Sequence, residues 1–307
     1  MNKTKMIAGI LATALALTAC GANPQPTQPQ AGAVETIVAA TLQAVTQEAA
    51  GQSPAPTSQS VTPEAGSQPT AQPAGTPVSF QNVSFIIPPG LADGATPEVI
   101  PLADESTGSD PWGMAPEHIV FTLTNYPAIE NNPTAATLHV YPAQPYADVN
   151  PWAANSIEKL RAFLANPGAT VANDNAPTVP FLGAAAQQYA AQIHALDFNN
   201  GNGIRMISQY GQFPGPIAKD HSFYHYEGLT ADGKYLVAAR FPLILPLQST
   251  SDNPSADGPV YPSDMSDTAG LEAYYQGMTE KLSAADPNSF QPALSQLDAL
   301  IQSIQVK

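Results

Sequence analysis

Residues 186–210, AQQYAAQIHALDFNNGNGIRMISQY, decide the fold. Two segments of strand character, Gln188 to Phe198 and Gly203 to Tyr210, flank the turn sequence Asn199-Asn200-Gly201-Asn202. Asn-Gly supplies the positive φ angles of a tight turn, so we expect the two strands to form a hairpin. Strands that are joined directly, without a crossover helix, favour an antiparallel sheet.

A second hairpin is predicted immediately downstream. Its strands are Phe223 to Gly228 and Lys234 to Leu245, and the turn Thr230-Ala231-Asp232-Gly233 joins them. Pro242 and Pro246 have no N–H group to donate to a neighbouring strand. We therefore expect the second strand to fray or to lie at an edge of the sheet.

Three more strands are predicted upstream of these hairpins. A loop rich in Gly, Pro, Asp and Glu separates the first two and extends to about Glu117, and Asn131-Asn132-Pro133 breaks the chain again. The three strands are Ser79 to Ile87, His118 to Tyr126 and Thr137 to Tyr141.

The sequence also predicts three helices. The first begins at Asn150, an N-cap residue that Pro151 follows. A second is expected at Gly270 to Leu282, and a third begins near Pro292. Strands and helices in this order predict a single α+β domain over residues 78–307, with a largely antiparallel sheet of hairpins covered by helices. The apolar faces of the first and last helices are Ile157, Leu160 and Leu164, and Leu294, Leu297, Leu300, Ile301 and Ile304.

The N-terminus has a different character. Lys3 and Lys5 precede an almost purely apolar run from Met6 to Ala16, which Leu17-Thr18-Ala19-Cys20 follows. This order is typical of a secretory signal peptide, and the apolar run is shorter than the ~20 residues that a bilayer-spanning helix needs. Leu-Thr-Ala-Cys matches the lipobox, so the chain resembles bacterial lipoproteins.

The resemblance implies removal of a signal peptide at residues 1–19, a diacylglycerol thioether on Cys20, and acylation of the Cys20 amine by a chain such as palmitate. Such a protein is anchored in the cell membrane or the outer membrane, on the extracytoplasmic face, at about 0.8 kcal/mol per buried methylene. The alternative is an ordinary secreted protein. Cys20 is the only cysteine, which excludes a disulfide framework and a thiolate metal site in the mature chain.

Residues 20–77 predict a disordered tether. The segment is rich in Pro, Gln and Thr and has neither an aromatic nor a basic residue, so it cannot bury enough apolar surface to become ordered. A flexible coil of this length spans about 40 Å. Residues 34–47 have helical spacing and predict a short amphipathic helix, which either forms transiently or docks on the domain, the membrane or a partner. Its apolar residues are Val34, Ile37, Val38, Leu42 and Val45.

The charge of the chain limits its partners. It has 25 acidic and 10 basic residues, a formal net charge of −15 at pH 7. Lys3 and Lys5 leave with the signal peptide, which makes the mature chain more acidic still. Such a chain repels phosphate backbones and anionic headgroups, so we predict no nucleic-acid partner and a membrane affinity that comes from the lipid on Cys20.

The motifs of known chemistries are incomplete. His221 and His225 lie four residues apart, but on a strand that separation is about 13 Å, too far for one metal ion. The stretch that begins at Asp197 opens like a calcium loop, but Gly201 and Asn202 depart from that motif and a hairpin turn explains them. No Gly-x-Ser-x-Gly, Walker or dinucleotide-binding motif is present. We therefore predict no catalytic residue, no metal ligand and no cofactor.

The remaining candidates for ligand binding are aromatic or cationic. Trp112 lies in a long loop, and Tyr224 and Tyr226 lie on the second hairpin. They form either a platform for sugar or peptide or a core with one loop anchor. Arg205 and Arg240 are scarce cations in an acidic chain, and each either pairs inside the sheet or holds the carboxylate of a ligand.

The order of the elements and the N-terminal features each resemble those of a known group of proteins. The order of strands, helix, hairpins and C-terminal helix is loosely similar to the Mog1/PsbP-like sandwich, an architecture that carries no catalytic motif. The lipobox, the tether and the sequence Asp197-Phe198-Asn199-Asn200-Gly201 together resemble a group of bacterial lipoproteins.

These observations predict a lipid-anchored extracytoplasmic protein with a non-catalytic binding or structural role at the cell envelope, whose partner is a small molecule or another envelope protein. The alternative is an envelope hydrolase or a calcium-dependent enzyme. A cleft in which His194, His221 or His225 lies within about 3 Å of a carboxylate or a serine would favour the enzyme. A closed surface or a shallow aromatic face would favour binding or structure.

Overall fold

A computed structural model describes residues 74–130, 132, 134–167, 171, 175–179 and 185–307. The predicted signal peptide, the lipidation site Cys20, the helix at residues 34–47 and residues 20–73 of the tether lie outside these residues. The part of the chain that the structure describes is therefore the C-terminal domain. The predicted end of the tether at residue 77 is too late, because Thr76 and Pro77 already belong to a strand. In the part of the chain that is described, no helix is both long and apolar enough to cross a bilayer.

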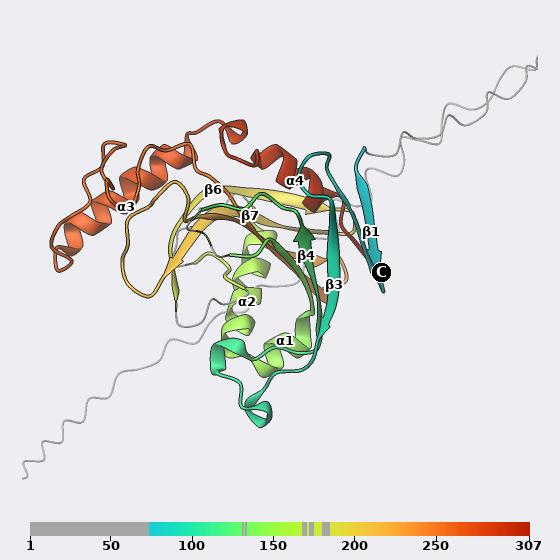
Figure 1. Cartoon of the computed structure of the whole chain (residues 1–307). Coiled ribbons are helices and arrows are strands. Elements are labelled where there is room, and N and C mark those ends of the chain that lie inside the picture. Colours follow the sequence, from blue (N-terminus) through green and yellow to red (C-terminus); the bar gives the residue numbers. More distant parts are fainter. Residues whose placement is uncertain (1–73, 131, 133, 168–170, 172–174, 180–184) are drawn as a thin grey trace, which may run out of the picture. The chain divides into compact units, whose positions relative to one another are not determined.

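The main element of the domain is an antiparallel sheet in which seven strands are described (Figure 1). Each strand runs antiparallel to its neighbours, and two of the connections are the predicted hairpins, β6–β7 and β8–β9. This confirms the predicted α+β class with an antiparallel sheet. In spatial order the strands are β3 (Gly94–Ile100), β4 (His118–Thr124), β5 (Thr137–Pro142), β9 (Tyr235–Pro242), β8 (Phe223–Thr230), β7 (Gly201–Gly211) and β6 (Ala186–Phe198).

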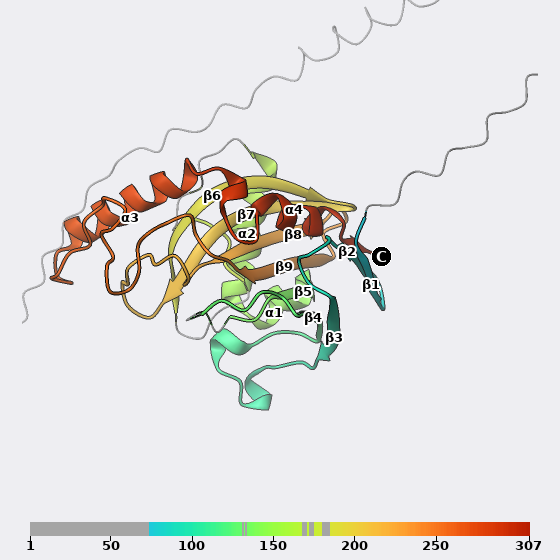
Figure 2. The same cartoon turned by 45° about the horizontal axis from the view of Figure 1, so that its top comes forward.

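Helices cover both faces of this sheet (Figure 2). On one face, α1 (Ala143–Val149) and α2 (Pro151–Ala165) form a core with the sheet. On the other face lie α3 (Thr268–Ser283) and α4 (Leu294–Gln302), together with a small antiparallel sheet. Its strands, in spatial order, are β1 (Thr76–Phe80), β2 (Val83–Ile87) and β10 (Gln305–Val306).

Helix α2 begins as its sequence predicts. The Asn150 side chain accepts hydrogen bonds from the backbone N–H groups of Trp152 and Ala153, at 3.0 and 3.1 Å, and Pro151 occupies the first helical position. The predicted residues Ile157 and Leu160 are buried against the sheet. The cap thus fixes where the apolar face of α2 starts.

The predicted strand from Ser79 to Ile87 is wrong, because the chain reverses in the middle of it. Gln81 and Asn82 form a two-residue turn, and Phe80 pairs with Val83 across it. Gln81 has φ +50°, a left-handed conformation that is uncommon for a residue other than glycine. The sequence around the turn holds neither glycine nor proline, so Asn82 is the one turn-favouring residue that signals the reversal.

Three short elements were missed. Strand β3 lies in the predicted loop before Glu117, and its Pro97 is tolerated because β3 is at the edge of the described sheet. Helix α1 contains Pro145 in its first turn, where a backbone N–H group has no helical partner in any case. Strand β10 has only two residues.

Two details of the predicted hairpins need correction. Strand β9 lies between β5 and β8 and not at an edge, and it ends at Pro242. In the β6–β7 hairpin, Phe198 pairs with Gly201 across the turn Asn199-Asn200, and none of the positive φ angles falls on the turn or on Gly201. Glycine is needed at 201 because a Cβ atom there would overlap the ring of Phe198.

Candidate functional site

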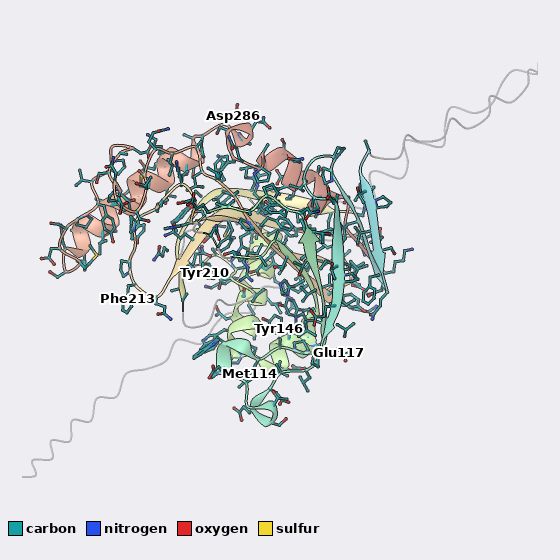
Figure 3. All side chains as sticks on the ribbon, in the orientation of Figure 1. Met114, Glu117, Tyr146, Tyr210, Phe213 and Asp286 are labelled. Carbon is teal, nitrogen blue, oxygen red and sulfur yellow. The ribbon has the colours of Figure 1, made fainter. Side chains whose placement is uncertain are left out.

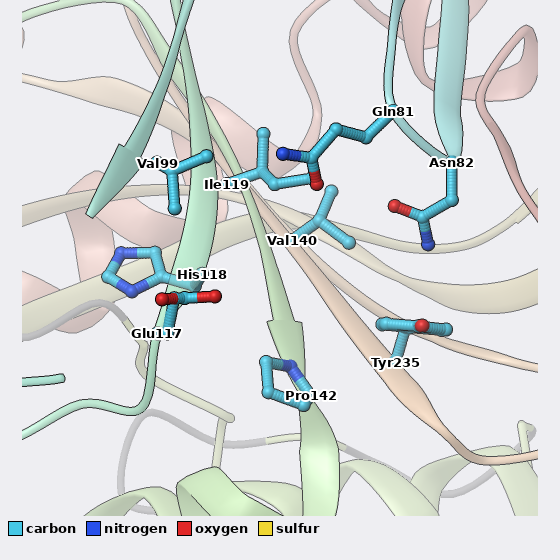
Figure 4. A pocket seen from close by; sticks show the side chains of 9 residues that line it. All are labelled: Gln81, Asn82, Val99, Glu117, His118, Ile119, Val140, Pro142 and Tyr235. Carbon is cyan, nitrogen blue, oxygen red and sulfur yellow. The ribbon is translucent and has the colours of Figure 1, made fainter. Parts of the chain in front are cut away.

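A cavity of about 210 Å³ lies where the β1–β2 turn approaches one end of the large sheet (Figure 4). Four strands of the large sheet end or begin there: β3 and β5 with their last residues, and β4 and β9 with their first. The lining therefore comes from five separate parts of the sequence. The lining residues are Gln81, Asn82, Val99, Glu117, His118, Ile119, Val140, Pro142 and Tyr235.

The apolar side chains of the lining form one wall of the cavity, and polar groups stand around it. Val99, Ile119 and Val140 supply the apolar surface, and in Figure 4 the amide of Gln81 reaches toward Ile119. Within the described residues, neither this amide nor the carboxylate of Glu117 makes a hydrogen bond. A ligand that entered the cavity would therefore meet a free amide and a free carboxylate beside an apolar surface.

The turn that carries Gln81 is fixed in place. The Asn82 side chain donates a hydrogen bond to the carbonyl of Lys307 at 3.1 Å, and the Lys307 backbone N–H group donates one to the carbonyl of Asn82 at 2.8 Å. These bonds tie the β1–β2 turn to the last residue of the chain. Gln81, next to Asn82, has a left-handed backbone conformation, and backbone strain of this kind is often found at binding sites.

His118 does not bring a positive charge to the cavity. Its Nδ1 is 2.8 Å from the carbonyl of Pro116, and its ring stacks on Tyr141 with 4.2 Å between the centroids. Burial lowers the pKa of His118 below its ordinary value, so the ring is neutral at pH 7. Glu117 is then the one charged side chain of the lining, and the cavity favours a neutral or positively charged ligand.

Arg205 and Tyr224, both predicted as ligand-binding residues, are used inside the domain. Arg205 on β7 is 5% exposed, and its Nε lies 3.4 Å from Oδ1 of Asp298 on α4. The hydroxyl of Tyr224 donates a hydrogen bond to the same oxygen at 2.8 Å. Burial raises the pKa of Asp298, and it outweighs the opposite effects of Arg205 and Tyr224. Of the two roles considered for Arg205, pairing is therefore the one that the structure supports.

Of the other three predicted residues, Tyr226 lies beside this pair, whereas Trp112 and Arg240 lie apart from it. Tyr226 is buried on the same face of the sheet, and its hydroxyl donates a hydrogen bond to the carbonyl of Leu196 at 3.0 Å. Trp112 lies in a short 3-10 turn, Pro111–Gly113, and is 37% exposed. Arg240 lies on the opposite face, which α1 and α2 cover. The five residues do not form one site.

A histidine does lie close to a carboxylate, but not in a cleft. His225 Nε2 is 3.0 Å from Oε1 of Glu227, and the two residues are 1% and 0% exposed. The hydroxyl of Ser156 donates to the other oxygen of Glu227 at 3.1 Å, so the carboxylate stands between the serine and the histidine. In a hydrolase the histidine must stand between them to accept the proton of the serine. Neither His225 nor Glu227 lines the cavity of Figure 4.

The metal-binding alternative has no support in the described residues, where no three His, Cys, Asp or Glu side chains are close enough to share an ion. His225 lies on β8 as predicted, and His221 precedes that strand, with its Nε2 3.8 Å from the carboxylate of Asp220. The calcium-loop stretch forms the β6–β7 hairpin.

Known proteins give no guide to the cavity. No family model, no curated protein and no solved structure matches this chain. The likeness to the Mog1/PsbP-like sandwich and to a group of bacterial lipoproteins therefore stays a prediction. What the cavity binds has to be inferred from its side chains.

The residues of the cavity were missed at the level of the sequence. Gln81 lies inside a run that resembles one strand, Glu117 ends a polar loop, and Tyr235 is one of several tyrosines on the hairpins. They are far apart in the chain, and only the pairing of β9 with β5, and of β5 with β4, brings Tyr235 near Glu117. The one local clue is Gln81-Asn82, two amides in the middle of an otherwise largely apolar segment.

Proposed function

We propose that the protein is a lipid-anchored, non-catalytic binding module on the extracytoplasmic face of the cell envelope, and that its cavity binds a sugar ring. One observation carries the proposal: the free amide of Gln81 and the free carboxylate of Glu117 face the same cavity, beside apolar side chains. The amide both donates and accepts hydrogen bonds and the carboxylate accepts them, which is the pattern that hydroxyl groups need. The apolar C–H face of a sugar packs on side chains such as Val99 and on the ring of Tyr235.

The charge of the cavity favours an amino sugar over an acidic one. Glu117 supplies a negative charge, and the lining holds neither lysine nor arginine. A protonated amine of the ligand would form a charge-assisted hydrogen bond with Glu117, which is roughly twice as strong as a neutral one. An acidic sugar would meet repulsion there.

Glucosamine is expected to bind to the full-length protein in detergent, and the Glu117→Gln variant is expected to bind it at least about tenfold more weakly. The substitution removes the charge and keeps the shape of the side chain. Titration calorimetry with glucosamine, glucose and glucuronic acid measures the order of affinity, which we expect to fall in that sequence.

The matched control is Glu105→Gln, which removes the same charge from an exposed loop residue outside the cavity. Its affinity for glucosamine should equal that of the wild type. The Gln81→Gly variant relieves the left-handed backbone and deletes the amide, so it should fold and bind weakly. The proposal is wrong if none of the three sugars binds, or if both Glu→Gln variants bind alike.

The proposed anchor rests on the lipobox at Leu17-Thr18-Ala19-Cys20. Cells that are grown with an alkyne fatty acid should incorporate the label into the wild-type protein, and Cys20→Ser should abolish it, because the thioether and the cleavage both require the cysteine. The labelled protein should partition into the membrane fraction. Equal labelling of the two proteins, or a wild type that stays in the cytosol, would contradict the anchor.

A further inference from the structure

Arg240 differs from Arg205 in having no partner. It lies on β9, half-buried, on the face of the sheet that α1 and α2 cover. Two of its nitrogens, Nε and Nη1, are shielded from solvent and have no hydrogen-bond acceptor in the structure. No acidic side chain of the described residues lies within 4.0 Å of its guanidinium group. A shielded cation without an acceptor is costly, so such groups are nearly always paired or bound to a ligand.

The surroundings of Arg240 are polar, and the buried carboxylate among them, that of Glu227, is hydrogen-bonded to other groups. His225 on β8 and Thr137 on β5 pair with Arg240 across the sheet. Burial lowers the pKa of the Arg240 guanidinium, whereas Tyr141 and Tyr210 raise it. Tyr210, and Tyr146 on the covering helix α1, can be located in Figure 3.

The histidine next to Arg240 is neutral. His139 on β5 has its Nδ1 3.0 Å from the hydroxyl of Tyr141 and its Nε2 3.1 Å from the hydroxyl of Thr137. Burial, and then the charge of Arg240, lower the pKa of His139 to about 3. His139 therefore adds no positive charge beside Arg240.

The buried carboxylate on this face is not free to pair with Arg240. Glu227 accepts hydrogen bonds from His225, from the hydroxyl of Ser156 and from the backbone N–H group of Val179. These bonds occupy both of its oxygens. The acceptor that Arg240 lacks must therefore come from elsewhere.

We propose that Arg240 is the centre of a second binding site, which takes a small oxyanion such as a carboxylate or a phosphate group. The planar guanidinium group binds either one through two parallel hydrogen bonds. The Tyr210 hydroxyl, which is shielded from solvent and has no hydrogen-bond partner in the structure, is available to donate to the same anion. This site is independent of the proposed sugar cavity, which is lined by other residues and has the opposite charge.

The experiment uses the full-length protein in detergent and follows thermal unfolding in sodium chloride, sodium acetate and sodium phosphate at equal ionic strength. Acetate or phosphate should raise Tm in a saturable way that chloride does not reproduce, and the better of the two identifies the chemistry of the ligand. Arg240→Met should weaken the effect at least about tenfold. Because the wild-type cation is unpaired, Tm of Arg240→Met in chloride alone should not fall below that of the wild type.

Two controls make the result specific. Arg161→Met removes the same charge from the exposed surface of α2 and should leave the anion effect unchanged. Arg240→Lys keeps the charge but loses the planar group, so it should fold and bind the anion with intermediate affinity, and it replaces Arg240→Met if that variant does not fold.

The proposal would be overturned by an anion effect that survives Arg240→Met, by one that Arg161→Met removes equally, or by the lack of any difference between the three salts. Asp174, an acidic residue outside the described part of the chain, provides a further test. If Asp174→Asn and Arg240→Met lowered Tm in chloride by the same amount, the acceptor would be a side chain of this protein and not a ligand.

Discussion

Replacing Gly203 by alanine is expected to lower the free energy of unfolding by about 3 kcal/mol, which is the upper end of the usual cost of overpacking. Gly203 lies on β7 and pairs with Gly228 on β8. A Cβ atom at 203 would come closer than 3.0 Å to the carbonyl oxygen of Glu227, to the Tyr226 hydroxyl and to the Cα atom of Gly228. Two of these three are backbone atoms of a paired strand and cannot move without breaking the sheet.

The close approach at Gly203 also involves Tyr226, which is buried in the sheet. Its hydroxyl lies over Gly203 and Gly228, and it donates a hydrogen bond to the carbonyl of Leu196. The two glycines make room for the tyrosine, which then ties β8 to β6 across β7. Alanine at 203 would therefore disturb both the strand pairing and this hydrogen bond.

Urea unfolding, followed by circular dichroism, measures the effect. Gly113→Ala is the matched control, because a Cβ atom at 113 has no neighbour within 4 Å and the φ angle there is not positive. We expect that control to change the stability by no more than about 0.5 kcal/mol. Similar losses for the two variants would show that the cost comes from chain flexibility and not from the close approach of β7 and β8.

The parts of the fold that could be predicted from the sequence are those with a local cause. The hairpins have turn sequences, and Asn150 with Pro151 carries its own cap signal. The β1–β2 turn has a weaker signal, Asn82 alone, and the turn is bonded through Asn82 to Lys307 at the other end of the chain. Tertiary contacts overrode local propensity there.

The candidate sites show the same limit. Arg205 and Arg240 were equivalent in the sequence, since both are isolated cations on predicted strands. The register of β7 and β9 turns Arg205 toward α4, where it meets Asp298, and turns Arg240 toward α1 and α2. A one-residue shift in either strand would have exchanged the faces. Whether such an arginine meets an acidic partner is thus a property of strand pairing, which the sequence alone does not reveal.

Removing either member of the Arg205–Asp298 pair is expected to cost about 3 to 5 kcal/mol of unfolding free energy. Asp298→Leu would leave the Arg205 guanidinium, 5% exposed, without a counter-charge and the hydroxyl of Tyr224 without its acceptor. Arg205→Met would leave the Asp298 carboxylate in an environment that already raises its pKa. Each single variant therefore leaves the other member of the pair, Arg205 or Asp298, without its ionic partner in a largely buried place.

The double variant Arg205→Met/Asp298→Leu is expected to be far more stable than the sum of the single effects implies, within about 1.5 kcal/mol of the wild type. Apolar side chains of similar volume fill the space and no charge is left without a partner, although Tyr224 still loses one hydrogen bond. Urea unfolding of the four proteins gives the coupling free energy. Additive losses would contradict the assignment of Arg205 as a structural residue, and would restore it as a ligand-binding candidate beside Arg240.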